Sequence, residues 1–320
     1  MKKLGWVLMI AFALVLSACS SESSGDASGT GDDPDKPTIA MTVINQEALF
    51  FTEMVKGAEE MADELGVNLH VYNANNKQVD QYNAIENFIS EGADALIINA
   101  IDAGSLLPVV EKAESEGIPV ISVDSVIQHD SVDVQIGVDN SEESIKLGEY
   151  FNEYANENFS DGAKLGVVGA LNAFVQVNRQ DSFLETVESN GINVVDIVDS
   201  ENVQEKALTA SEDLLISNSD MDAVFVTGEP AFIGAVSAVR TQNMQDKVKL
   251  FGWDLSPQVV QGIDEGFVEA VIQQHPDQYG AESVSAAINI INGEEVESLI
   301  DVPATIVTKD NVDEFRSLFE

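Results

Sequence analysis

Apolar and polar positions along the chain follow two alternating periods, which predicts strands that are each followed by a helix. Thr38 to Ile44 is a short apolar run, rich in β-branched residues, of the kind that forms a buried strand. Apolar residues then recur at three- and four-residue steps from Phe51 to Leu65, and Gly66 ends this predicted helix. Because the unit recurs down the chain, we expect an α/β fold with parallel sheets and helices on both faces.

The whole pattern divides into two series of such units. The predicted strands cover 38–44, 67–73, 95–99, 118–124, 135–139, 164–169, 194–198, 223–227, 248–254, 268–274 and 302–307. The predicted helices cover about 51–65, 79–90, 105–116, 142–157, 177–189, 204–216, 232–240 and 278–292. A chain of 320 residues exceeds the usual size of one core, so we expect two Rossmann-like lobes.

The elements that follow the second series predict that the chain returns to the first lobe. We assign residues 37–137 plus 275–303 to lobe 1 and residues 138–274 plus 304–320 to lobe 2. More than one connection would then join the lobes. Connections of this kind form a multi-strand hinge.

The amino terminus has the pattern of a secretory signal peptide, predicted over residues 1–18. A basic start is followed by the apolar stretch 4–15, which is shorter than a membrane span. Residues 16–19, Leu-Ser-Ala-Cys, resemble a bacterial lipobox, which implies cleavage before Cys19 and its lipidation. Several acyl chains anchor a protein stably. We therefore expect residues 19–36 to be a lipidated cysteine and flexible linker that hold the protein on the membrane outside the cytoplasm.

Charge and composition exclude several other classes of function. The net charge is −41, which argues against nucleic acid as a partner, because such binding needs a basic face. Cys19 is the only cysteine, and the histidines are His70, His129 and His275. Sequence motifs for a catalytic nucleophile, a phosphate-binding loop or a metal site are missing. We expect no metal and no cofactor.

Polar residues at the carboxyl ends of predicted strands are the strongest candidates for a site. Ligands of open α/β sheets bind at those ends. Carboxylates and amides bind hydroxyl groups, and aromatic rings cover the apolar face of a sugar. Strand-end Asp and Asn residues also form turns or helix caps, so each alone has a structural alternative. The set is Phe50, Phe51, Asn99, Asp124, Asp254 and Gln274.

Residues 37–320 resemble the type I periplasmic binding proteins of sugar ABC transporters, in the ribose-binding-like branch. The resemblance depends on motifs that run in order along the chain: Thr38-Ile-Ala, Phe50-Phe51 with Gly57-Ala58, Ile97-Ile-Asn99, Ile118 to Asp124, Gly137 to Asn140, Ala223-Val-Phe, Gly252-Trp-Asp254 and Gln274 to Gln278. It implies stacking by Phe50 and Phe51 and sugar binding by Asn99, Asp124, Asp254 and Gln274. It also implies a monomer that closes two lobes around a sugar or polyol and delivers it to a membrane permease.

The chain departs from the family pattern at several positions that would contact the ligand. Ala48 replaces an Asn, Ser125 and Val177 each replace an Arg, Asn202 replaces an aromatic residue, and Gly228 replaces an Asn and is followed by Glu229. Arg179 keeps a family arginine that we interpret as structural. A sugar or polyol other than ribose in its usual pose fits, as does a ligand with its own donors for the carboxylates. Secondary candidates for ligand contact are Ser125, Asn202, Glu229, Trp253 and His275.

Two other functions are compatible with the same fold. A sensory subunit for chemotaxis or a quorum signal would bind its ligand in the same way. A secreted enzyme that acts on sugars would need an acid/base pair, for which Asp124 with Asp254 is the only candidate. We expect a binding protein and not an enzyme.

Overall fold

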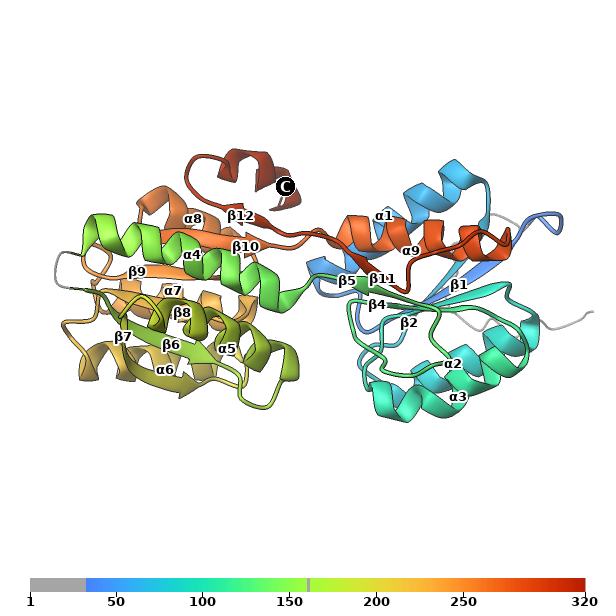
Figure 1. The fold of residues 1–320 in the computed structure, drawn as a ribbon, viewed down its shortest axis with the longest axis horizontal. Helices are drawn as coiled ribbons and strands as arrows, with labels where there is room; N and C mark the ends of the chain where they lie inside the picture. Colours follow the sequence, from blue (N-terminus) through green and yellow to red (C-terminus); the bar gives the residue numbers. More distant parts are fainter. Residues whose placement is uncertain (1–32, 160–161, 320) are drawn as a thin grey trace, which may run out of the picture.

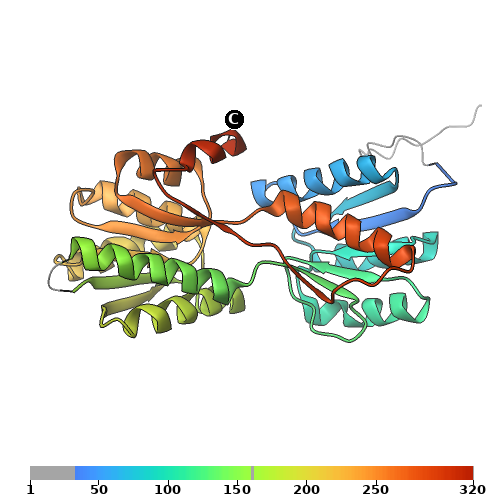
Figure 2. The same cartoon turned by 45° about the horizontal axis from the view of Figure 1, so that its top comes forward.

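A computed structural model describes residues 33–159 and 162–319 of the chain. The predicted signal peptide, Cys19 and most of the predicted linker lie outside these residues. The described chain forms two six-stranded sheets, each covered by helices on both faces. Figures 1 and 2 show them as two lobes side by side. The predicted α/β fold with two Rossmann-like lobes is confirmed.

The first sheet has the strand order β11-β5-β4-β3-β1-β2, and all of its pairs are parallel. Its strands are β1 Thr38–Val43, β2 Asn68–Asn73, β3 Ala95–Ile98, β4 Val120–Val123, β5 Val134–Gly137 and β11 Leu299–Asp301. Helices α1 Leu49–Leu65 and α9 Pro276–Ile291 share one buried cluster with the sheet. Helices α2 Gln78–Glu91 and α3 Ala103–Ser115 cover the other face.

The second sheet has the order β12-β10-β9-β8-β6-β7, with only the edge pair β10–β12 antiparallel among the pairs of its described strands. Its strands are β6 Lys164–Gly169, β7 Asn193–Asp199, β8 Ala223–Val226, β9 Lys249–Trp253, β10 Val268–Gln273 and β12 Thr305–Val307. Its helices are α4 Asn140–Asn158, α5 Phe174–Glu188, α6 Gln204–Ser217, α7 Glu229–Thr241, α8 Pro257–Glu265 and the 3-10 helix η1 Val312–Phe319. Two apolar clusters, one on each face, hold this lobe together.

The chain passes between the two sheets at 138–139, 274–275 and 302–304 (Figure 1). The predicted strand 302–307 is confirmed only at 305–307, which form β12, because residues 302–304 connect β12 to β11 in the other sheet. Pro303 lies between them, and proline cannot donate a backbone hydrogen bond to a sheet. Helix α8, strand β11 and η1 were not expected from the pattern.

Helices α1 and α9 pack unusually closely, at two glycines. A Cβ on Gly57 would lie 2.6 Å from the carbonyl carbon of Asp277, with the carbonyl oxygen closer still. A Cβ on Gly280 would lie 2.7 Å from the backbone nitrogen of Ala58. The two backbones touch where any side chain would separate them. This contact holds α1 against α9, the helix that follows the crossing at 274–275.

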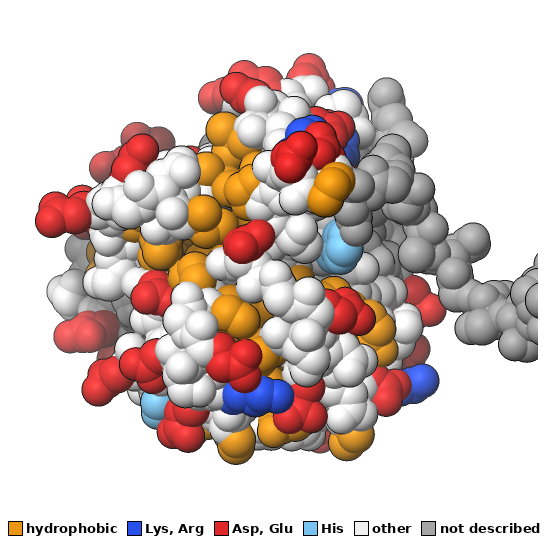
Figure 3. Space-filling model, turned by 90° about the vertical axis from the view of Figure 1, so that its right-hand side faces the viewer, with side chains coloured by type: hydrophobic (Ala, Val, Ile, Leu, Met, Phe, Trp, Pro, Cys, Tyr) orange, Lys and Arg blue, Asp and Glu red, His pale blue; other side chains and the backbone are white. Residues whose placement is uncertain are grey.

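Acidic side chains are scattered over the face of the molecule that Figure 3 shows. Figure 3, which views one end of the molecule, shows many Asp and Glu side chains and few Lys and Arg side chains on that face. This distribution agrees with the net charge of −41. Scattered like charges favour solubility.

Candidate functional site

A cavity of about 620 Å³ lies between the two lobes. Its wall combines the start of α1, the ends of β4 and β9, the starts of α5 and α7, the hinge segment 273–277 and η1. Predicted site residues that line it are Phe50, Phe51, Asp124, Ser125, Asn202, Glu229, Asp254, Gln274 and His275. The structure therefore brings together candidates from both lobes.

Asp124 and Asp254 occupy equivalent positions in the two lobes. Each follows the last residue of a central strand, β4 or β9, and each has a positive φ, 61° and 63° respectively. A non-glycine residue adopts this conformation at a cost, and such residues cluster at functional sites. The backbone amide of Asp124 donates to the oxygen of Ile136 at 2.8 Å, and that of Asp254 donates to Ile272 at 2.8 Å. The neighbouring strand thus holds each carboxylate at the cavity wall.

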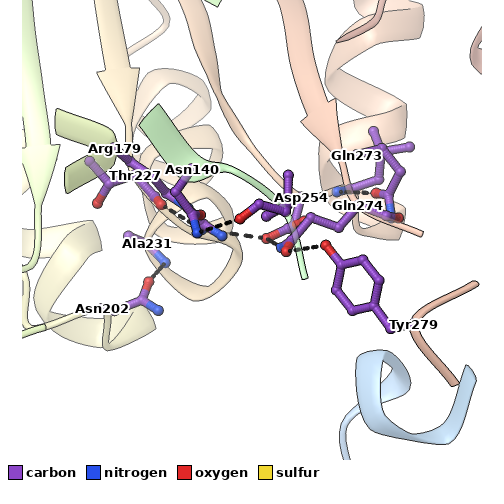
Figure 4. Close-up of polar contacts among 11 residues, drawn as sticks. Asn140, Arg179, Asn202, Thr227, Ala231, Asp254, Gln273, Gln274 and Tyr279 are labelled. Atoms are coloured by element: carbon purple, nitrogen blue, oxygen red, sulfur yellow. Dashed lines mark hydrogen bonds and ion pairs between the residues drawn. The ribbon is translucent and has the colours of Figure 1, made fainter. Parts of the chain in front are cut away.

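Amide side chains orient the two carboxylates. Asn99 Nδ2 donates to Asp124 Oδ2 at 3.0 Å, and Gln274 Nε2 donates to both carboxylate oxygens of Asp254 at 3.0 Å each. Tyr279 Oη donates to Gln274 Oε1 at 3.2 Å, so Tyr279 holds the amide that in turn holds Asp254 (Figure 4). Burial raises the pKa of Asp124 to about 6, although Asn99 lowers it. Burial also raises the pKa of Asp254.

Asn99 and Trp253 lie behind the cavity wall and do not line it. Asn99 has no exposed surface, and its Oδ1 accepts from the amide of Ile44 at 3.2 Å. Trp253 is also fully buried, and the guanidinium of Arg179 lies over its ring at 3.8 Å from the centroid. In this structure both residues support a neighbour that lines the cavity.

Arg179 lines the cavity, although the sequence indicated only a structural role. Its Nε donates to Asn140 Oδ1 at 2.7 Å, and its Nη1 donates to the carbonyl of Thr227 at 3.1 Å (Figure 4). Nη1 also lies 3.8 Å from Asp254 Oδ2. Burial lowers the pKa of Arg179, while Asp254 and then Asp124 raise it. A guanidinium stays charged in proteins, so Arg179 compensates part of the negative charge of the cavity.

Aromatic rings form the apolar part of the wall. Phe50 and Phe51 meet edge to face, with ring centroids 5.3 Å apart, and Phe50 lies 6.0 Å from Tyr279. Phe315, from η1, also lines the cavity and lies 6.2 Å from the ring of His275. Leu318 and Phe319 of η1 line it too. Sequence reasoning missed η1, because it predicted no element there.

His275 and Ser125 line the cavity, but each already has a partner. His275 Nε2 lies 2.8 Å from Thr305 Oγ1, which ties the hinge segment to β12. Ser125 Oγ accepts from the amide of Ala100 at 2.5 Å. Both side chains therefore have a local structural role as well as a place on the wall.

The starts of α5 and α7 form a polar corner of the cavity. A Cβ on Gly228 would lie 2.5 Å from Gln176 Nε2 and 2.9 Å from Asn202 Oδ1, so glycine leaves these side chains their space. Asn202 Oδ1 accepts from the amide of Ala231 at 3.3 Å (Figure 4). Burial and then the charge of Asp254 raise the pKa of Glu229 to about 7. Gln176 was missed by the sequence analysis.

The described residues hold neither a cluster of metal ligands nor a helix that could span a membrane. Within residues 33–159 and 162–319, His, Cys, Asp and Glu side chains form no group that could hold a metal ion. In the same part of the chain, none of the helices combines the length and apolar character needed to cross a membrane.

The sequence and the fold match a known family. The family model described as "Periplasmic binding protein domain" matches residues 39–295. The chain belongs to this family. The predicted ribose-binding-like member of the type I periplasmic binding proteins is thereby confirmed, as is the prediction that the protein is a binding protein and not an enzyme.

Curated relatives and solved structures cover nearly the whole chain. The ribose import binding protein RbsB of Bacillus subtilis is 26% identical over 310 residues, which are 97% of this chain and 100% of the relative. The protein of the same name from Haemophilus influenzae is 29% identical over 310 residues, with the same coverage. An ABC transporter solute-binding protein from Bacillus halodurans, solved with bound myo-inositol, is 25% identical. Its TM-score is 0.77, and the match covers 90% of this chain and 99% of that one.

Proposed function

We propose that this protein is the extracytoplasmic substrate-binding lipoprotein of an ABC-type importer for a sugar or polyol. The observation that carries the proposal is the pair of strand-end carboxylates, Asp124 and Asp254, which face one cavity from opposite sheets. A ligand whose hydroxyl groups donate to both carboxylates would bridge the two lobes. The relatives named for ribose import and the structure with bound myo-inositol support this class of ligand.

The binding energy comes from the wall that the two lobes share. Hydrogen bonds to charged groups contribute about 1.5 to 3 kcal/mol each, and Phe50 and Phe51 offer rings for the apolar face of a sugar. A dissociation constant near 1 μM corresponds to about 8 kcal/mol. A few such contacts supply this amount after the cost of association.

The mechanism is closure of two lobes, 37–137 plus 275–303 and 138–274 plus 304–320, about their connecting segments. Asp124 belongs to the first lobe, and Asp254 and Arg179 belong to the second. A ligand held by one lobe stabilises the closed form through its contacts with the other. A membrane permease would then recognise the closed monomer and accept the ligand.

Two measurements on the purified protein test the binding proposal. A thermal-shift screen of sugars and polyols should find a stabilising ligand, because a ligand at one hundred times its dissociation constant adds about 2.7 kcal/mol. Small-angle scattering should then show a smaller radius of gyration with that ligand. Binding without compaction would contradict the closure mechanism.

Transport and membrane attachment need tests in the producing cell. Deleting the gene should abolish uptake of the ligand identified in the screen, whereas uptake that persists would favour a sensory subunit. A Cys19→Ser variant should lose incorporation of a labelled fatty acid and should be released from the membrane. Fatty-acid labelling that survives this substitution would refute the proposed anchor at Cys19.

A further inference from the structure

The cavity wall carries far more negative than positive charge. Six carboxylates line it against one guanidinium, that of Arg179, in the part of the wall that the structure describes. The carboxylates are those of Glu53, Asp124, Glu229, Asp254, Asp277 and Glu314. A ligand that enters displaces water from these groups, and an uncompensated charge is costly to strip of water.

Arg179 does not neutralise the carboxylate of Glu229 at the start of α7. Its Nε and Nη1 are bonded to Asn140 and Thr227, and its flat face rests on Trp253. Its ion-pair partner is Asp254, whose Oδ2 lies 3.8 Å from Nη1 of Arg179. Arg179 therefore balances about one of the carboxylates around it.

Glu229 has no partner for its carboxylate. Over residues 33–159 and 162–319, no hydrogen bond or ion pair reaches this side chain, which lies half-buried on the cavity wall. It begins α7, where the positive end of the helix dipole favours an ionised carboxylate. A partly dehydrated carboxyl group without a cation therefore faces the ligand space, and a cation beside it would stabilise its ionised form.

Gln176 provides an independent sign of a missing donor at the same corner. Its side chain is 8% exposed and lines the cavity, and its Oε1 has no hydrogen-bond partner in the structure. The neighbouring position 228 is glycine, and a Cβ there would press on Gln176 and Asn202. The corner thus presents an unpaired carboxyl group and an unpaired amide oxygen on the cavity wall. Both suit an incoming group that donates hydrogen bonds and carries positive charge.

We propose that the natural ligand is a sugar or polyol with a protonated amine, and that the amine binds between Glu229 and Gln176 Oε1. The inference rests on the proposed sugar-binding function and adds the chemical class of the ligand. An ammonium group offers three donors and a full positive charge. A hydroxyl group at the same place would offer one donor and leave the charge of Glu229 uncompensated.

Calorimetric titration of matched sugar pairs at pH 7 tests this proposal. The pairs are D-glucosamine with D-glucose, D-galactosamine with D-galactose, D-mannosamine with D-mannose, and D-glucamine with D-sorbitol. We expect the wild-type protein to bind at least one amino compound about tenfold or more tightly than its neutral counterpart. Glu229→Gln should bring that ratio close to one, through a loss of affinity for the amino compound.

Glu205→Gln is the matched control, because Glu205 is exposed and lies in the first turn of α6. It removes one negative charge outside the cavity and should leave the ratio unchanged. Neutral compounds that bind as tightly as every amino counterpart would overturn the ligand class but leave sugar binding intact. A preference that survives in Glu229→Gln would overturn the role of Glu229. Failure of every compound to bind would overturn both this inference and the proposed function.

Discussion

The close packing of α1 against α9 predicts that Gly280→Ala destabilises the protein. An added Cβ would lie 2.7 Å from the backbone nitrogen of Ala58 and closer still to the carbonyl oxygen of Met54, whereas ordinary van der Waals contacts begin near 3.4 Å. Backbone atoms cannot rotate away, so the helices must separate by about 0.7 Å or more. A gap of that size forfeits about a quarter to a half of the dispersion energy of the contacts it opens.

The expected loss in the free energy of unfolding is about 2 kcal/mol. Overpacking typically costs about 1 to 3 kcal/mol and occasionally more. Alanine has a higher helix propensity than glycine, which offsets this cost by up to about 1 kcal/mol. Urea denaturation measures the difference as a lower midpoint with an unchanged slope.

Gly104→Ala, near the start of α3, is the matched control. Its added Cβ would meet nothing closer than a side-chain oxygen of Asp102 at 3.6 Å. We expect no loss and a gain of at most about 1 kcal/mol. The reasoning fails if Gly280→Ala unfolds at the wild-type urea concentration, or if Gly104→Ala loses as much stability.

Three further predictions concern the site. Asp254→Asn should weaken binding of the best ligand by about 2 kcal/mol, measured by calorimetry, and unchanged affinity would remove Asp254 from the site. Asn99→Ala should cost about 1 to 3 kcal/mol in urea unfolding, because it leaves the Ile44 amide and the Asp124 carboxylate without a partner; wild-type stability would refute its supporting role. Since the pKa of Glu229 rises from 4.5 to about 7 on folding, its contribution to stability is present below pH 4.5 and is lost as the pH rises through 7. Glu229→Gln should flatten that decline in melting temperature, and an unchanged slope would contradict the shift.

Much of the fold was readable from the sequence because long strands and helices have strong periodicity. Strands such as β3 and β4 are fully buried and appear as continuous apolar runs. Strand β11 has three residues, and its Leu299 is 62% exposed, so it carries no such signal. The segment 302–307 is largely apolar and was therefore predicted as one strand, but its first half connects the two sheets and only 305–307 form β12.

The strand-end acids were predictable, whereas the contribution of α5 was not. Parallel strands bring their carboxyl ends to one edge, so Asp124 and Asp254 follow from topology. Helix α5 buries Gln176, Arg179 and Gln180 in its first turns, so its inward face is polar and its amphipathic pattern is weak. Whether those side chains meet a ligand depends on how the two lobes face each other, which no local pattern records.

The interleaved path of the chain has a consequence for its synthesis. Neither lobe is an uninterrupted stretch of polypeptide, because β11 adds an edge to the first sheet and β12 adds an edge to the second only at residues 299–307. A nascent chain emerging from the ribosome therefore lacks both edges until translation is almost complete. Premature termination after β10 would leave two unfinished halves, so a protease should degrade such fragments quickly while sparing the full-length product.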